Sequence, residues 1–282
     1  MHIPDTLSTT ERLRRLVGDT VVIADMWRLA GRWADGLLLL GGLKPVVDAL
    51  DTEHQAVHAL TTAHMLVDQA TFSGVDTLIS RSALLDTALM HAQQVHNSAL
   101  LGAVWNARGL SLHSAFLDTA RTTEPPDELA SFQRGLEAYQ QAQDQRGIAE
   151  SLFHIGLVYG VVRQDHTQAL PFFTQSYELA QTIPDQIIAS YAIRHIGFAQ
   201  HNAGQVDAAH ASLQESLRLR EQAGFIPGIA MALVMLAYAA SELHQPTLAL
   251  ERLHRAKTIF QQLGAEKKIS WIDQLIIEFQ KE

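Results

Sequence analysis

The sequence predicts an all-α fold, a right-handed α-solenoid of paired helices that ends in a C-terminal capping helix. Three observations predict it. Apolar residues recur at helical spacing from about Thr20 to Phe279, no sustained period-two alternation occurs, and the C-terminal half of the chain repeats itself. Short turns with Gly, Pro or Asp separate the helical segments, as stacked helix pairs require.

The repeat has a period of about forty residues, and matching positions carry matching residue types. Three sets lie at this spacing: Ala169, Ala209 and Ala249; Phe173, Leu213 and Leu253; Ser176, Ser216 and Ala256. A fourth set occurs one helix earlier: Gly156, Gly197 and Ala237. Self-similarity at a fixed period is typical of repeat architectures, in which each unit buries its apolar face against the next.

Within each repeat the first helix carries two apolar residues, then a small residue, and a fourth position three residues later. The three sets are Leu152, Ile155, Gly156 and Tyr159; Ile193, Ile196, Gly197 and Gln200; and Leu233, Leu236, Ala237 and Ala240. With the A-x-x-x-F spacing of the second helix, this order resembles the tetratricopeptide (TPR) pattern. The period exceeds the roughly 34 residues of that family. In this respect the chain resembles the TPR regions of bacterial signal-responsive regulators and peptide-pheromone receptors.

The repeat is strong over Gly147–Leu263 and weaker upstream, and the motif positions before residue 100 are not placed. Upstream pairs are expected at Thr20–Leu50, at Glu53–Ala70 with Val75–His96, and around Trp105 with Glu128–Ala142. Lys267–Phe279 reads as the capping helix, which makes six helix pairs plus a cap. We therefore divide the chain into a divergent N-terminal region (1–50), TPR-like repeats (51–263) and a capping helix (264–282).

Composition excludes several classes of function. The formal charge is -9, with 21 Lys and Arg against 30 Asp and Glu, so direct binding of nucleic acid is not expected. There is no Cys, which excludes disulfides and zinc sites built on thiolates. The uncharged stretch Gln222–Ser241 is interrupted by Gly224, Pro227 and Gly228, so no membrane span is expected. The N-terminus lacks a secretory signal, and we expect a cytoplasmic protein.

The resemblance implies that first helices line a concave groove and offer one arc of side chains to a ligand. The candidate ligand-binding residues on that arc are Asn106, Glu150, Phe153, Tyr191, Arg194, Phe198, His201, Asn202, Tyr238 and Glu242. Aromatic rings with a few placed polar groups suit a peptide, a protein segment or a small anionic organic ligand.

Two polar features of the groove each have two interpretations. Arg194 either forms a structural ion pair with Glu150 or grips a ligand carboxylate or phosphate. His201 and Glu242 fall close enough for a hydrogen bond, which either holds two repeats together or forms an acid–base pair. His154 and His195 occupy equivalent positions just beyond the groove arc, where a packing role is expected.

His54 and His58 are a weak metal candidate, because two His four residues apart share one helix face. No third ligand can be assigned, and solvated or groove-lining His is the competing interpretation. No Gly-rich phosphate loop and no G-x-S-x-G motif is present, so we expect no cofactor.

Two functions remain open at this stage. The first is a regulatory or adaptor binding module that holds a peptide or other ligand in its groove. The second is an enzyme or small-molecule sensor with an occluded pocket, in which His201 and Glu242 would carry the proton chemistry. The sequence indicates neither the ligand nor the oligomeric state, and fold class does not decide between the two.

Overall fold

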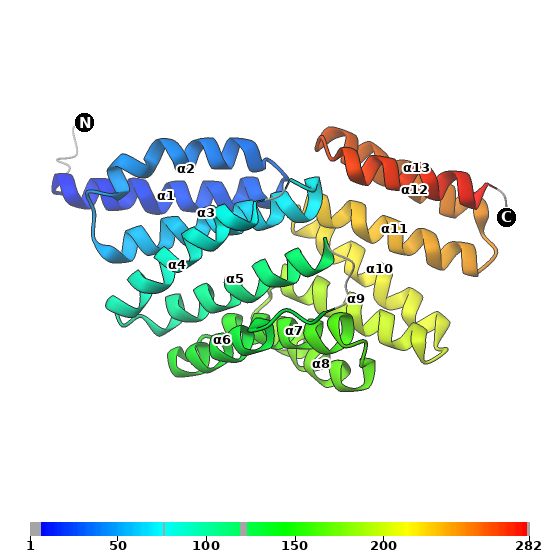
Figure 1. The fold of residues 1–282 in the computed structure, drawn as a ribbon. Helices are drawn as coiled ribbons and strands as arrows, with labels where there is room; N and C mark the ends of the chain where they lie inside the picture. The colour runs from blue at the N-terminus through cyan, green and yellow to red at the C-terminus, as the bar shows by residue number, and fades with distance from the viewer. Residues whose placement is uncertain (1–6, 76, 119–122, 281–282) are drawn as a thin grey trace, which may run out of the picture.

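The computed structural model describes residues 7–75, 77–118 and 123–280, and this part of the chain is built from α-helices with no strand (Figure 1). The first six helices are α1 (Thr9–Leu29), α2 (Trp33–Val47), α3 (Thr52–Ser73), α4 (Leu78–Gln94), α5 (Ser98–Leu117) and α6 (Glu128–Ala142). The other seven are α7 (Gln145–Leu157, continued by a π-helical turn at Val158–Val162), α8 (His166–Thr182), α9 (Gln186–Asn202), α10 (Val206–Gln222), α11 (Ile226–Glu242), α12 (Pro246–Gln262) and α13 (Glu266–Phe279).

Consecutive helices pack as six pairs followed by α13, which confirms the predicted count for the described residues. One boundary differs from the prediction, because α1 begins at Thr9 and not near Thr20. Ser8 and Glu11 cap each other's backbone N–H groups there, and this capping box starts the helix before the apolar pattern becomes visible. No helix in the described ranges is long and apolar enough to cross a membrane.

Aspartate side chains cap three successive helices in the middle of the chain. The side chains of Asp144, Asp165 and Asp185 each accept a hydrogen bond from a backbone N–H in the first turn of α7, α8 and α9. A helix terminus leaves its first N–H groups without partners inside the helix, and a short acidic side chain satisfies one of them. These caps therefore stabilise the starts of α7, α8 and α9.

In two helix pairs the small residue of the first helix receives a phenylalanine ring of the second helix. A Cβ added at Gly109 would lie 2.4 Å from the Phe132 ring, and one at Gly156 would lie 2.6 Å from the Phe173 ring. At Gly197 the space is closed by Ser212 Cβ at 3.1 Å and by the Ala209 carbonyl oxygen at 3.3 Å. The helices of a pair approach this closely only because no side chain intervenes.

A hydrogen bond between the two helices of a pair recurs at the same repeat position. Ser176 donates to the Ala149 carbonyl at 2.7 Å, and Ser216 donates to the Ser190 carbonyl at 2.7 Å. Both hydroxyl groups are buried, so each bond satisfies a donor that would otherwise be costly to bury. The next residue in the series, Ala256, lacks a hydroxyl and contributes only packing.

His154 and His195 link neighbouring pairs, which confirms their predicted packing role. Each imidazole stacks at 4.8 Å on the phenylalanine ring of the preceding second helix, His154 on Phe132 and His195 on Phe173. Burial lowers the pKa of His154 to about 3 and lowers the pKa of His195 well below its usual value. The folded state therefore holds both rings neutral.

We expect Gly197→Leu to destabilise the fold by about 1–3 kcal/mol, because the new side chain would force α9 away from α10. Gly18→Leu on α1 is the matched control, since a side chain there meets nothing within 4 Å. Urea unfolding followed by circular dichroism measures both. Equal stability of the two variants would contradict the packing described for Gly197.

We expect the free energy of unfolding to fall as the pH drops below about 6.5. In that range the unfolded chain binds protons at His154 and His195 while the folded chain does not, which costs up to about 1.4 kcal/mol per pH unit for each ring. His154→Gln should reduce this slope, because it removes about one of the protons that the unfolded chain takes up in excess of the folded chain. Urea titrations between pH 5 and 8 measure the slope, and an unchanged slope in His154→Gln would refute the assignment.

Candidate functional site

The concave wall between α7 and α9 is aromatic. The Phe153 and Tyr191 rings stack at 5.3 Å with 28° between their planes. The His195 ring lies edge-on to Phe153 at 5.6 Å and to Phe198 at 5.3 Å. Three of the predicted groove residues (Phe153, Tyr191 and Phe198) therefore belong to one surface, which His195 joins from beside the predicted arc.

Arg194 lies on this aromatic wall. Its guanidinium carbon is 5.8 Å from the Tyr191 ring centroid and 5.7 Å from that of Phe198, within cation–π range of both. Its Nη2 donates to His195 Nε2 at 2.9 Å, while its buried Nε–H has no partner among the described residues. Burial lowers the pKa of Arg194, and Tyr191 opposes that shift.

The ion pair expected between Glu150 and Arg194 is not formed, and no carboxylate in the described ranges pairs with this guanidinium. Glu150 lies one helical turn after Arg146 on α7, and its negative charge acts on Arg146. Burial raises the pKa of the Tyr139 hydroxyl, and the charge of Glu150 adds to that shift. The stacked Phe153 and Tyr191 rings lie between α7 and α9.

A second buried arginine beside Tyr191 was not identified from the sequence. Arg220 of α10 is 1% exposed, and its guanidinium carbon lies 5.2 Å from the Tyr191 ring centroid. Its Nη1 donates to the Gly228 carbonyl at 2.6 Å, while Nη2 is buried with no partner in the described chain. Burial and the charge of Arg194 lower the pKa of Arg220 to about 9, so it remains cationic at neutral pH.

A comparison of equivalent repeat positions would have identified Arg220 as an unusual residue. The residues forty positions before and after it are Ala180 and Phe260, and all three are buried. A charged residue at an otherwise apolar repeat position is costly unless something compensates for it. Arg194 and Arg220 thus place two cations against one tyrosine ring.

Helix α3 faces this wall from the other side of the concave interior. Asp68 of α3 pairs with Arg28 of α1 at 2.8 Å, and the negative field of Asp68 reaches Tyr191. Burial, with a smaller contribution from Asp68, raises the pKa of Tyr191 to about 12. The phenol is therefore neutral, and the charges of Asp68, Arg220, Arg194 and Arg28 all act on it.

Other predicted groove residues lie apart from this wall. Asn106 is 2% exposed and accepts a hydrogen bond from Ser151 Oγ at 3.1 Å, so it is buried between α5 and α7. Tyr238 lies edge-on to Phe279 of the capping helix at 5.5 Å and is 37% exposed. The structure does not bring these two residues to the Tyr191 wall.

The contact expected between His201 and Glu242 is present. His201 Nε2 lies 2.8 Å from Glu242 Oε2, at the C-terminal ends of α9 and α11. Both side chains are about half exposed, at 46% and 49%, and Asn202 beside them is also exposed. This geometry is that of a surface contact between adjacent repeats.

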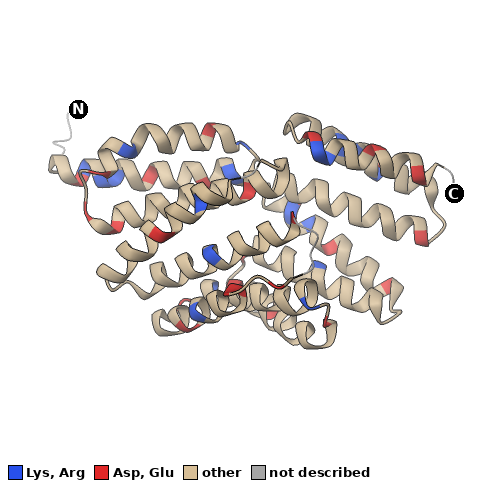
Figure 2. Ribbon diagram, in the orientation of Figure 1, with Lys and Arg blue, Asp and Glu red and all other residues tan. Residues whose placement is uncertain are grey.

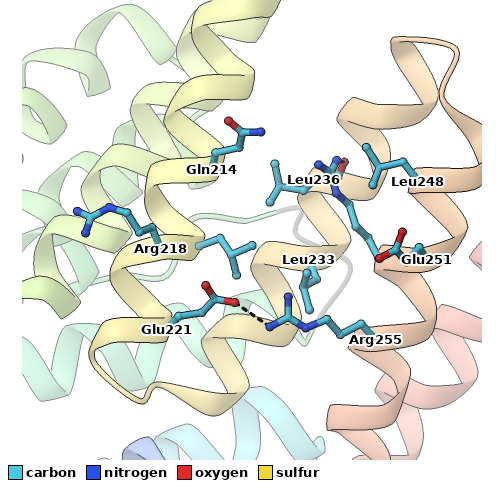
Figure 3. Close-up of a pocket in the computed structure, with 10 residues that line it drawn as sticks. Gln214, Arg218, Glu221, Leu233, Leu236, Leu248, Glu251 and Arg255 are labelled. Atoms are coloured by element: carbon cyan, nitrogen blue, oxygen red, sulfur yellow. Dashed lines mark hydrogen bonds and ion pairs between the residues drawn. The ribbon is translucent and has the colours of Figure 1, made fainter.

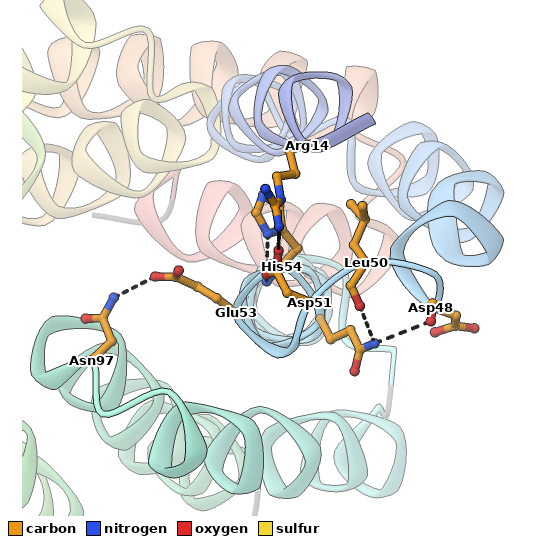
Figure 4. Close-up of polar contacts among 8 residues, drawn as sticks. Arg14, Asp48, Leu50, Asp51, Glu53, His54 and Asn97 are labelled. Carbon is orange, nitrogen blue, oxygen red and sulfur yellow. Dashed lines mark hydrogen bonds and ion pairs between the residues drawn. The ribbon is translucent and has the colours of Figure 1, made fainter. Parts of the chain in front are cut away.

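The two histidines of the weak metal candidate bind different groups. His54 Nδ1 lies 2.6 Å from Asp51, the residue that caps α3 and that lies beside His54 in Figure 4. His58 is buried and its Nε2 lies 2.8 Å from the Leu40 carbonyl of α2. Within the described ranges no group of three or more His, Asp or Glu side chains could hold a metal ion.

Two cavities open on the outer face, between successive second helices. One of about 250 Å³ lies between α10 and α12, with Leu233 and Leu236 of α11 among its lining residues and the Arg255–Glu221 ion pair at 2.7 Å (Figure 3). The other, of about 290 Å³, lies between α8 and α10 and shares Arg218 with the first. Basic and acidic residues are both spread over the described part of the ribbon, except along α11, which has no charged residue before Glu242 (Figure 2).

The sequence matches no protein-family model and no curated protein. Among solved structures, NprR in complex with its cognate peptide NprX aligns with a TM-score of 0.69 at 12% identity, covering 100% of this chain and 76% of that chain. BtubC (BKLC) from P. vanneervenii aligns with a TM-score of 0.51 at 13% identity, covering 92% of this chain and 93% of that chain. The chain thus has the fold of TPR-like helical solenoids, which confirms the predicted fold class.

Proposed function

We propose that this protein is a peptide-binding module whose ligand carries an anionic group that binds Arg194. One observation carries the proposal: a cation on the concave wall, with a buried Nε–H that has no partner and no carboxylate paired to it in the described chain. A buried charge is costly unless it is paired, and a planar guanidinium suits a carboxylate or a phosphate.

The surroundings of Arg194 suit a peptide. The partly exposed rings of Tyr191 and Phe198, with the buried Phe153 behind them, offer apolar area for side chains, while the guanidinium supplies a fixed polar contact that would set orientation. The peptide complex of NprR, whose fold this chain shares, supports the same class of ligand. The free C-terminal carboxylate of a peptide is the simplest anion for the site.

We further propose that the module acts in the cytoplasm, without a cofactor, and that residues 1–50 form an N-terminal region distinct from the repeats. The lack of Cys favours a reducing compartment.

We expect Arg194→Ala to weaken peptide binding by about 2–5 kcal/mol, and Arg194→Lys to restore only part of the loss, because an ammonium group lacks the planar fork. Fluorescence anisotropy with a library of short labelled peptides, each with a free or an amidated C-terminus, measures both effects. Amidation should weaken binding to the parent protein and have little effect on Arg194→Ala.

Arg218→Ala is the control for loss of a positive charge, because Arg218 is half exposed on the outer face and pairs with Glu215. It should leave peptide affinity unchanged. If Arg194→Ala and the parent protein bind every peptide with equal affinity, the peptide site does not lie on this wall.

The His201–Glu242 contact is the one observation that favours the alternative, an enzyme. As an exposed pair it should contribute only about 0–1 kcal/mol to stability, so His201→Ala and Glu242→Gln should change stability and affinity little. As an acid–base pair, the same changes should slow conversion of a bound compound by ~10²-fold or more while binding persists. Mass spectrometry of bound compounds over time separates the two outcomes, and we expect no turnover.

A further inference from the structure

The two ends of the solenoid touch each other. In a solenoid each repeat normally contacts only its neighbours. Here α3, in the second helix pair, contacts the terminal helix α13, and Lys267 Nζ donates to the Gly74 carbonyl at 2.9 Å across 193 residues of chain. In Figure 1 the end of α3 lies beside the C-terminal helices.

Two glycines allow the ends to come this close. Gly31, after α1, and Gly74, after α3, both have a φ of 75°, in the left-handed region that favours glycine. A Cβ at Gly31 would lie 2.3 Å from the Leu263 side chain, and one at Gly74 would lie 2.5 Å from the Lys267 side chain. C-terminal side chains thus occupy the space that a larger residue at either glycine would need.

An aromatic chain connects this contact to the concave wall. Trp33 of α2 stacks on Phe72 of α3 at 5.9 Å, and Phe72 meets Phe225 edge-on at 6.0 Å. Phe225, at the start of α11, lies 5.7 Å from the Tyr191 ring. The Tyr191 ring, which contacts Arg194 and Arg220, is therefore also the last ring of this aromatic chain.

We propose that the contact around Gly31, Gly74, Phe72 and Phe225 is a clasp, which opens and closes the superhelix and thereby controls access to Tyr191. Opening separates α1–α3 from α11–α13 and leaves every interface between neighbouring repeats intact. The clasp differs from the proposed peptide site, and its motion can be tested without a ligand.

The composition of the clasp suits reversible opening. Apolar packing and the hydrogen bond from the exposed Lys267 contribute to the clasp, while the ion pairs Arg14–Asp51 and Arg28–Asp68 lie within the N-terminal helices. Within the apolar cluster of the clasp the Trp33 indole N–H is buried and has no partner among the described residues. An unsatisfied buried donor penalises the state that buries it.

Because the chain has no Cys, spin labels can be placed at chosen positions. Asp35→Cys on α2 and Glu266→Cys on α13 put exposed labels on either side of the clasp. Pulsed electron double resonance then gives the distribution of distances between the two ends. In the parent protein we expect a dominant short distance and a minor longer one.

Gly31→Val should wedge the clasp open and increase the longer-distance population several-fold. Gly204→Val is a matched control, because Gly204 has the same φ of 75° but nothing within 4 Å of an added Cβ. It carries the same backbone strain without the wedge and should keep the parent distribution. Circular dichroism shows that each variant is folded.

Lys267→Met tests the clasp without backbone strain, because it removes the hydrogen bond to Gly74 and keeps most of the side-chain stem. We expect a smaller shift in the same direction as for Gly31→Val. The clasp is refuted if folded Gly31→Val and Lys267→Met both retain the parent distribution, or if Gly204→Val opens the ends as much as Gly31→Val. The peptide site at Arg194 can fail its own test without affecting this result.

Discussion

The middle of the solenoid depends on the fit of a phenylalanine ring against a glycine in two helix pairs, Phe132 over Gly109 and Phe173 over Gly156. In the α7–α8 pair this close approach also lets the buried Ser176 hydroxyl reach the Ala149 carbonyl. The same phenylalanines then offer a ring face to the histidine of the next pair. In these pairs a single contact thus sets the spacing of the two helices and the position of the following pair.

Much of the fold could be predicted from the sequence because this fit leaves a periodic trace. From Gly147 onward, glycine and alanine at one position and apolar knobs at another locate the helices of each pair. The start of α1 could not be predicted from apolar periodicity, because a capping box of polar residues sets it. The contact between the two ends was also beyond the sequence, since Gly74 and Lys267 carry no signal of a partner 193 residues away.

The site was predictable only in part, for a related reason. Helical spacing identified Tyr191, Arg194 and Phe198 as one face, and the structure places them together. Spacing could not show that Glu150 would remain near Arg146 of its own helix, nor that Asn106 would be buried between helices. Those outcomes depend on how far one repeat is displaced and rotated relative to the next, which the periodicity of a single helix does not contain. Arg220 could have been identified as unusual by comparing the second helices of successive repeats, but the groove residues were predicted from the first helices alone.

Arg194 and Arg220 also connect stability to binding. Two cations beside one tyrosine, neither paired with a carboxylate in the described chain, lower the stability of the folded state, because burial penalises their charge. An anion bound there would remove part of that penalty, and a ligand that binds only the folded chain stabilises it by mass action. Since Tyr191 also ends the aromatic chain that joins the two ends of the superhelix, any ligand that displaces its ring acts on Phe225 and on the clasp. Tyr191 therefore contacts both the two buried arginines and the aromatic chain that leads to the clasp.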